Sequence, residues 1–345
     1  MKKLVLFSFG LFLSAHAWTQ GCVAIRNVAG ISPDLLFRNV QPNDKLILNI
    51  TNRYFEAPKT YRGDKYVTDT LVRNKIYTLN MSLLRLFDNG WSLALNVPIS
   101  ANSRENYADH GGPKEPKHTT RAFGLGDFRI TLYKWLLNPT SYMKGNIQFG
   151  LGLKLPTGDY KYQDYFYRND STKVLAPVDQ AIQLGDGGTG ITAELSAFYS
   201  LQKSIHLFMN AYYLSNPREQ NGVSNLKGRN PTPAEIANNT TVMSVPDQYS
   251  VRGGANLQFQ NITISAAIRY ETVPVNDLIG GNKGFRRAAS ITSFEPGITY
   301  GMQNTLAFVY VGLPFERNIV QNSQNNMTPA GFANSVFYFG AQFKL

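Results

Sequence analysis

The chain is poor in cysteine, in charge and in long apolar runs. Its 345 residues include a single cysteine, Cys22, so neither an internal disulfide nor a cysteine metal site is available. Charged residues make up only 17%, few for a soluble protein, whereas a hydrophobic share of 43% excludes disorder over most of the length. Beyond residue 17 the sequence has no run of about 18 apolar residues, which excludes helical membrane spans.

The amino terminus has the pattern of a secretory signal. Lys2 and Lys3 precede an apolar run from Leu4 to Leu13, and Ser14-Ala15-His16-Ala17 supplies the small residues of a cleavage site. The apolar run is too short to cross about 30 Å of hydrocarbon as a helix. We therefore predict a signal peptide over 1–17, cleavage after Ala17 and export from the cytoplasm.

The excess of basic residues does not indicate nucleic acid. Lysine and arginine number 34 against 23 acidic residues, a formal charge of +11, but they are scattered along the chain and form no basic run among aromatics. Export also removes the chain from nucleic acid. We interpret these charges as solvated or as lining the inside of a barrel.

Apolar and polar residues alternate with a period of two in many segments. In the window 146–155 all ten positions obey the alternation, and the same pattern returns around 91–99, 191–199, 205–213, 262–270 and 337–345. The apolar set of the first window is Ile147, Phe149, Leu151, Leu153 and Leu155. This recurrence predicts an all-β fold.

The alternating segments predict about twelve strands. Most are about ten to thirteen residues long, which exceeds the usual five or six of a soluble sheet and suits a bilayer crossing at a tilt of about 45°. The connections alternate between tight turns and long polar loops, as in outer-membrane barrels. The predicted strands lie near 46–55, 75–86, 91–100, 124–135, 146–157, 190–201, 204–214, 247–259, 262–273, 289–300, 303–314 and 335–345.

We predict an antiparallel transmembrane β-barrel over 46–345, with short periplasmic turns and long extracellular loops. A secreted β-sandwich would share the alternation, but it gives no reason for uniform long strands or for long loops at one edge only. Aromatic residues near strand ends also suggest a membrane-interface girdle. They are Trp91, Trp135, Tyr199, Tyr213, Phe259 and Tyr300.

Three short motifs resemble a known family. They are Gly124-Leu125-Gly126-Asp127, Leu155-Pro156-Thr157-Gly158-Asp159 and Gly185-Asp186-Gly187-Gly188-Thr189-Gly190. Together they resemble the outer-membrane barrel proteins associated with the meta-pathway of phenol degradation, a family loosely similar to hydrophobic-compound channels. The resemblance is clearest from about 120 to 200, and it implies a barrel that takes up aromatic compounds. It supplies no binding residues to carry over.

No catalytic, metal or cofactor site is predicted. Gly185 to Gly190 lacks the Gly-Lys-Ser/Thr ending and the following helix of a phosphate loop. The aspartates of the 158–189 loop do not have EF-hand spacing. Of the exported histidines, His110 and His118 lie in a loop and His206 on a lumen-facing row, and none adjoins an obvious nucleophilic serine. An outer-membrane enzyme is therefore the third hypothesis.

Charged residues fall on the polar parity of the predicted strands, which places them in the lumen. On the lipid face a lysine or arginine near the midplane would cost about 2–4 kcal/mol. A barrel of eight strands is filled by side chains, and one of sixteen encloses a channel. A barrel of twelve strands is compatible with either a packed charge network or a polar path. The lumen-lining candidates are Asp127, Arg129, Lys154, Glu194, His206, Arg252, Arg269, Glu271, Glu295 and Lys344.

The segment 18–45 precedes the first predicted strand and is apolar for a periplasmic tail. We predict that it enters the barrel as a hatch against lumen aromatics such as Tyr212 and Phe198. The alternative is a disordered leader needed only for export and assembly. The hatch candidates are Ile25, Leu35, Leu36 and Phe37.

These patterns favour an outer-membrane channel or uptake protein for small solutes, aromatic or hydrophobic ones among them. A non-conducting structural or surface-interaction barrel is the alternative. The expected partners are the outer-membrane lipid bilayer, a small-molecule solute and the barrel-assembly machinery.

Overall fold

The computed structural model describes residues 32, 35, 45–68, 72–108, 116–139, 142, 144–320 and 330–345. The predicted signal peptide, Cys22 and His110 lie outside these residues, as do the hatch candidates Ile25, Leu36 and Phe37.

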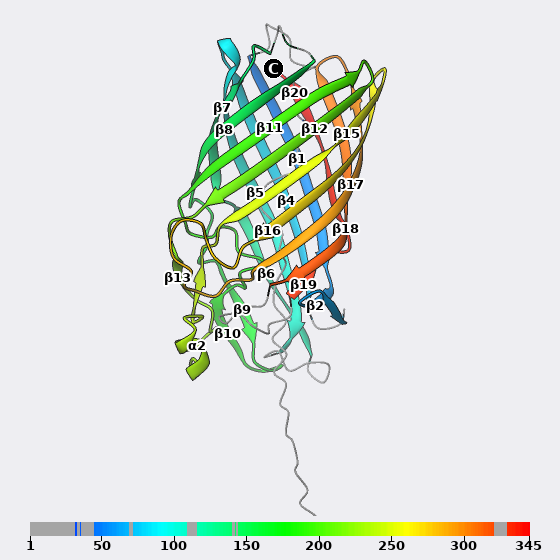
Figure 1. Cartoon of the computed structure of the whole chain (residues 1–345). Helices are drawn as coiled ribbons and strands as arrows, with labels where there is room; N and C mark the ends of the chain where they lie inside the picture. Colours follow the sequence, from blue (N-terminus) through cyan, green and yellow to red (C-terminus); the bar gives the residue numbers. More distant parts are fainter. Residues whose placement is uncertain are drawn as a thin grey trace, which may run out of the picture.

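Within the described residues the chain forms a closed antiparallel barrel of twelve strand positions (Figure 1). We call each strand position of the wall a stave; β6 and β7 together form one stave, and every other stave is a single strand. Each stave pairs with its neighbour in the chain, and β1 pairs with both β4 and β20, so the sheet has no free edge. The staves are β1 (Leu46–Ala57), β4 (Val72–Leu86), β5 (Trp91–Tyr107), β6 (Lys117–Leu125) with β7 (Phe128–Trp135), β8 (Gly145–Leu155), β11 (Gly190–Gln202), β12 (Ile205–Ser215), β15 (Gln248–Phe259), β16 (Ile262–Val273), β17 (Ala289–Gly301), β18 (Thr305–Ile319) and β20 (Val336–Lys344).

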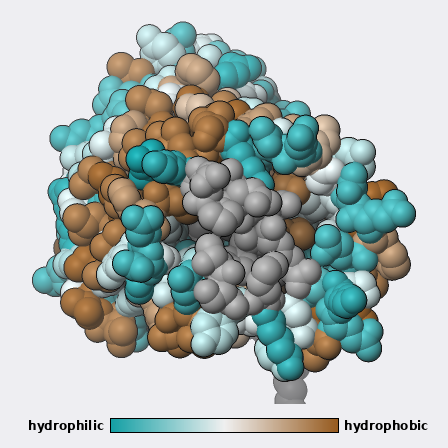
Figure 2. Space-filling view, turned by 90° about the horizontal axis from the view of Figure 1, so that it is seen from above, coloured by the Kyte–Doolittle hydropathy of each residue, from teal (hydrophilic) through white to brown (hydrophobic). Residues whose placement is uncertain are grey.

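The alternation in the sequence separates an apolar outer surface from a polar interior. On β8, Phe149, Leu151 and Leu153 are exposed on the outside by 53%, 66% and 51%, whereas Asn146 and Lys154 are buried inside. A register slip of one residue would place the apolar row in the lumen, so the alternation fixes the register. Viewed from the short-turn end, hydrophobic residues occupy much of the circumference, with hydrophilic ones among them (Figure 2).

Among the described residues, no helix is both long enough and apolar enough to cross a membrane.

Several strands extend further than predicted. β5 continues to Tyr107 instead of 100, and the fourth stave begins at Lys117 instead of 124. The added parts are mostly polar, so they do not show the sustained alternation that marks the membrane band. The fourth stave is also interrupted between Leu125 and Phe128, and both of its parts pair with β5.

The aromatic girdle is only partly as predicted. Trp91, Tyr199, Phe259 and Tyr300 are exposed on the outer surface by 43–57% near the short turns. Trp135 instead faces the lumen, where it packs edge-on against buried Phe198 with ring centroids 6.0 Å apart. Proximity to a strand end therefore did not determine which side of the wall this ring occupies.

The long loops carry structure of their own at the end opposite the short turns (Figure 1). β2 (Lys59–Arg62) pairs with β3 (Lys65–Thr68) and β19 (Ala330–Phe332), and β9 (Gln163–Tyr167) forms a hairpin with β10 (Lys173–Pro177). β13 (Gln220–Ser224) pairs with β14 (Val242–Ser244), and the loop between them holds the short helix α2 (Pro233–Ala237). At the other end, the 3-10 turn η1 (Asp88–Gly90) joins β4 to β5.

Candidate functional site

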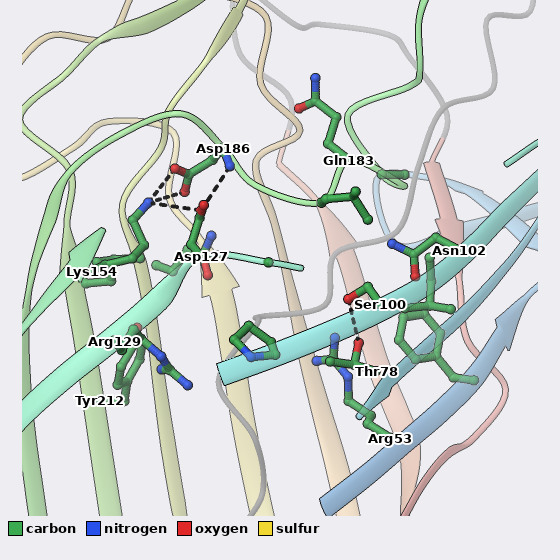
Figure 3. A pocket seen from close by; sticks show the side chains of 18 residues that line it. Arg53, Thr78, Ser100, Asn102, Asp127, Arg129, Lys154, Gln183, Asp186 and Tyr212 are labelled. Carbon is green, nitrogen blue, oxygen red and sulfur yellow. Dashed lines mark hydrogen bonds and ion pairs between the residues drawn. The ribbon is translucent and has the colours of Figure 1, made fainter. Parts of the chain in front are cut away.

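The three motifs that carry the family resemblance meet at one place inside the barrel wall, which we call the motif junction: Asp127, Lys154, Thr157, Gly158, Gly185 and Asp186. The interruption between β6 and β7 turns the Asp127 carboxylate to accept hydrogen bonds from the backbone N–H groups of Gly158 at 3.0 Å and Asp186 at 3.1 Å. The Lys154 ammonium binds the Asp186 carboxylate and lies 3.9 Å from that of Asp127 (Figure 3).

Close backbone approach explains the glycines of the junction. A Cβ on Gly158 would come within 2.9 Å of the Gly185 backbone, and one on Gly185 within 2.8 Å of the Gly158 carbonyl oxygen. The Thr157 hydroxyl ties the same strand end to β7, because it donates to Gly126 O and accepts from Phe128 N–H, both at 2.9 Å. The junction thus anchors both ends of the loop between β8 and β11.

Part of that loop, residues 178–184, enters the mouth of the barrel; we call it the inserted segment. Val178, Ile182 and Leu184 are at most 4% exposed and form one apolar cluster with lumen-facing side chains of β1 and β4. The strand partners in this cluster include Phe55 and Ile76. Burying several apolar side chains at about 25 cal/mol per Å² holds the segment inside the mouth rather than in solvent.

A buried carboxylate secures the inserted segment. Asp179 is 1% exposed and forms ion pairs with Arg287 at 2.9 Å and with Arg104 at 3.8 Å. Burial alone would raise the pKa of Asp179, but the two guanidinium groups outweigh it and hold that pKa well below its usual range. We call Asp179, Arg104 and Arg287 the latch.

A lysine beside the latch is the group there that titrates near neutral pH. Burial, together with the nearby arginines, lowers the pKa of Lys227 to about 8, although Asp179 opposes the shift.

The inserted segment is also held through its backbone, since the Asn102 amide donates a hydrogen bond to Ile182 O at 3.2 Å.

Beneath the inserted segment lies a cavity of about 70 Å³ (Figure 3). By the rule that one water needs 10–15 Å³ of such space, it holds about five waters. One side is apolar, with Phe55, Ile76 and Leu184, and the other carries the motif junction. Thr78, Ser100 and Asn102 add neutral polar groups.

Two arginines on aromatic rings line the same cavity. The Arg129 guanidinium on β7 lies 5.6 Å from the ring centroid of Tyr212 on β12. Arg53 on β1 lies 5.6 Å from the Phe55 centroid. The Glu194 carboxylate attracts the Arg129 guanidinium and also accepts a hydrogen bond from the Tyr133 hydroxyl at 2.8 Å.

Further around the lumen, arginines are neutralised by carboxylates. Arg269 binds Glu295 at 2.6 Å and Glu271 at 3.5 Å, and Arg252 binds Glu295 at 3.0 Å. Glu295 is fully buried. Arg252 also lies between the rings of Phe208 and Tyr310, at 4.8 and 5.2 Å. We call Arg252, Arg269, Glu271 and Glu295 the charge cluster.

The structure thus distributes the ten lumen candidates over several places. Asp127 and Lys154 lie in the motif junction, Arg129 lies at the cavity, and four others form the charge cluster. Lys344 ends β20 near the short turns, away from these groups. That they line a path for solute stays a prediction.

His206 has a serine neighbour that the sequence did not reveal. Strand pairing places Ser200 and Asn256 directly across from it on β11 and β15. However, His206 is fully buried, and Asn256 is bonded to Ser265 at 2.6 Å and to Ser32 at 2.7 Å. We interpret this row as lumen packing rather than as a nucleophile with substrate access.

The structure places His118 on β6, whereas the sequence predicted it in a loop. His118 stacks on Tyr167 with centroids 3.9 Å apart and lies 3.3 Å from Asp170. Within the described part of the chain no group of three or more histidine, cysteine or acidic residues is placed to hold a metal.

Part of the predicted hatch lies inside the barrel. Leu35 is 4% exposed and packs in a cluster with Leu306, Phe308, Tyr310 and Tyr338, rather than with the expected Tyr212 and Phe198. Whether the whole segment acts as a hatch stays a prediction.

Sequence reasoning missed several residues that shape the site. Arg53 sits in a predicted strand on the same parity as Thr51 and could have been found by extending the lumen parity to that strand. Arg104, Asp179 and Arg287 fall in segments predicted as loops, and no local pattern brings them together.

Comparisons with known proteins reveal relatives by fold alone. No protein-family model matches the sequence, and no curated protein sequence matches it. The phenol-pathway resemblance therefore stays a hypothesis that rests on its motifs.

Among solved structures the chain is similar to an outer membrane channel from Pseudomonas putida F1, with 11% identity and a TM-score of 0.56 over 88% of this chain and 96% of that one. A weaker similarity is to the translocator domain of autotransporter NalP from Neisseria meningitidis, with 8% identity and a TM-score of 0.46 over 88% of this chain and 90% of that one. The CymD monoaromatic hydrocarbon channel has 10% identity to this chain and a TM-score of 0.44, over 91% of both chains. The first similarity supports the fold: a closed twelve-stranded barrel of the outer-membrane type.

Proposed function

We propose that this chain is a channel or uptake protein of the outer membrane that passes small solutes, aromatic or hydrophobic ones among them. Its apolar outer surface suits a lipid bilayer, and its short turns and long loops suit the periplasmic and extracellular sides. Export would depend on the predicted signal, and insertion on the barrel-assembly machinery.

The inserted segment carries the proposal. A loop that enters the mouth over a cavity, held by the latch at one point and by the motif junction at its ends, is an arrangement that can restrict passage. The fully buried charge cluster favours the alternative, a packed and non-conducting barrel.

Single-channel recording in planar bilayers separates these two functions. A channel gives discrete conductance steps, and Asp179→Asn should increase open time or conductance because the latch loses its charge. Asp159→Asn, an exposed carboxylate in the same loop, is the matched control and should leave the steps unchanged. Absence of steps for the wild type and for Asp179→Asn, with heat-modifiable gel migration showing folded barrels, would favour the non-conducting alternative.

We also propose that the segment 18–45 is a hatch. Burial of Leu35 among lumen aromatics supports it. Deleting 23–40 should give larger or more frequent openings in a folded barrel, whereas unchanged conductance would leave the extracellular loops as the gate.

A further inference from the structure

The outer surface of the wall carries an open groove near the short turns, where β8, β11 and β12 lie side by side. Its volume is about 580 Å³, and most of the side chains around it are apolar. We infer that the groove, which we call the lipid groove, binds one phospholipid with an anionic headgroup, whose acyl chain lies in the groove and whose phosphate is bound by Lys144. The ligand is a component of the membrane, so this site is separate from the proposed passage of solutes through the lumen.

A small residue in the outward row of β11 makes the hollow. Ala197 pairs with Ile147 on β8 and with Met209 on β12, and both of these partners are exposed on the outside. Its outward neighbours along β11, Leu195 and Tyr199, are much larger side chains. The wall is therefore lower at the alanine than around it, and the hollow is bounded by apolar groups that suit an acyl chain.

The turn that follows β7 forms another side of the lipid groove, and a buried amide holds it in place. The Asn146 side chain accepts a hydrogen bond from Leu137 N–H at 3.0 Å and donates one to Leu137 O at 2.9 Å. Leu136 N–H donates to Ile147 O at 2.8 Å. Leu136 and Leu137 are nevertheless exposed and line the groove. The apolar surface is thus formed before any ligand arrives, which lowers the entropic cost of binding.

The end of the lipid groove at the short turns is basic. Lys144 is exposed there, with its ammonium 5.6 Å from the ring centroid of Tyr199. The stretches 134–147 and 197–209, which form the groove, contain three lysines and no acidic residue. Tyr199 also belongs to the exposed aromatic girdle, and such rings lie at the level of the lipid headgroups. Charge and depth together favour an anionic headgroup beside Lys144.

Native mass spectrometry of the full chain in detergent, with added phosphatidylglycerol or phosphatidylcholine, tests this site. The wild type should retain one phosphatidylglycerol more tightly than phosphatidylcholine. Ala197→Phe fills the hollow and should abolish retention of both lipids. Lys144→Gln should weaken retention of phosphatidylglycerol about fivefold, the factor expected for one lysine at an anionic lipid surface, and should leave phosphatidylcholine unchanged.

Two variants elsewhere on the barrel are matched controls. Ala266→Phe places the same ring at an exposed alanine on β16, and Lys161→Gln removes an exposed lysine that lies over a tyrosine ring in a long loop. Neither should change lipid retention. Ala197→Leu fills less of the hollow and should weaken retention in part, so it remains informative if Ala197→Phe does not fold.

Three results would overturn the lipid groove. Retention of phosphatidylglycerol that survives Ala197→Phe would place the lipid elsewhere on the wall. Equal affinity for the two lipids in the wild type would remove the role of Lys144. A wild-type dimer that Ala197→Phe dissociates would assign the groove to a second copy of the chain. The measurement uses lipid retention and not conductance, so its failure would leave the proposed channel standing.

Discussion

Arg269 and Arg252 lie on one part of the lumen wall and share the carboxylate of Glu295, whereas Arg129 lies on another part, over the ring of Tyr212 and beside a cavity. The first arrangement neutralises charge within the protein. The second combines the ring of Tyr212 with the attraction of the Glu194 carboxylate, beside a cavity. The same residue type therefore shares a buried carboxylate in the charge cluster and lies on an aromatic ring beside the cavity, and the difference lies in its partner.

Removing the shared carboxylate should have the largest effect. Glu295→Gln takes the shared carboxylate from two buried guanidinium groups, of which Arg269 keeps Glu271 at 3.5 Å, and breaking a buried pair in this way costs about 3–5 kcal/mol. Arg129→Gln should cost less than Glu295→Gln, because the Glu194 carboxylate that attracts Arg129 keeps its hydrogen bond from Tyr133. Urea unfolding of the barrel in lipid vesicles measures both. Equal losses of unfolding free energy in the two variants would show that Arg129 depends on a buried counter-charge as much as the charge cluster does.

The outer surface offers the next contrast, between faces of a single strand. Leu151→Arg on β8 places a charge in the membrane band and should cost about 2–4 kcal/mol near the midplane. Gln148→Arg on the lumen face should be tolerated. The folded fraction after assembly, read from heat-modifiable migration, compares them, and similar behaviour would mean that the assigned strand faces are wrong.

The latch should respond to acid but not to mildly acidic pH. Because the pKa of Asp179 is held well below its usual range, its ion pairs stabilise the closed mouth above the ordinary carboxyl range near 3.8 and are lost only as pH falls through the lower folded value. Open probability should therefore be the same at pH 7 and pH 5 and rise below about pH 4. A rise already between pH 7 and pH 5 would contradict the latch.

A smaller effect is expected on the alkaline side. With the pKa of Lys227 lowered to about 8 from its usual 10.5, the folded mouth binds fewer protons than the unfolded chain between these values, so its stability rises with pH there. From pH 8 to pH 9 the gain is about 1 kcal/mol. Protection of the inserted segment from protease should increase over this interval, and Lys227→Met should remove the dependence.

The wall of the barrel could be predicted from sequence because its physics is local. The residues of β8 alternate between the two faces of the wall by parity alone, with Leu151 exposed on the outside and Lys154 buried. Where the strands rise beyond the apolar band, as at Arg104 on β5, both faces are polar and parity carries no information. Trp135 was misplaced for a different reason: it was assigned by its position near a strand end, although it shares the parity of Arg129 on β7.

The site could be predicted only in part. Arg129 and Lys154 were found because they lie on strands, but the cavity exists because the inserted segment covers it. The partners of Asp179 are distant in sequence, with Arg287 lying 108 residues away. Neither a motif nor a period encodes such a contact.

That separation also has a consequence for biogenesis. Asp179 pairs with Arg104 on the earlier strand β5 and with Arg287 in a later loop, and β1 pairs with the last strand, β20. The mouth can therefore be latched only after more than four fifths of the chain has been laid down, and the sheet can close only after the final strand arrives. Contacts of such long range form late, so a barrel interrupted during assembly would have an unsecured mouth and an open seam, which makes completion of the wall and closure of the entrance nearly the same event.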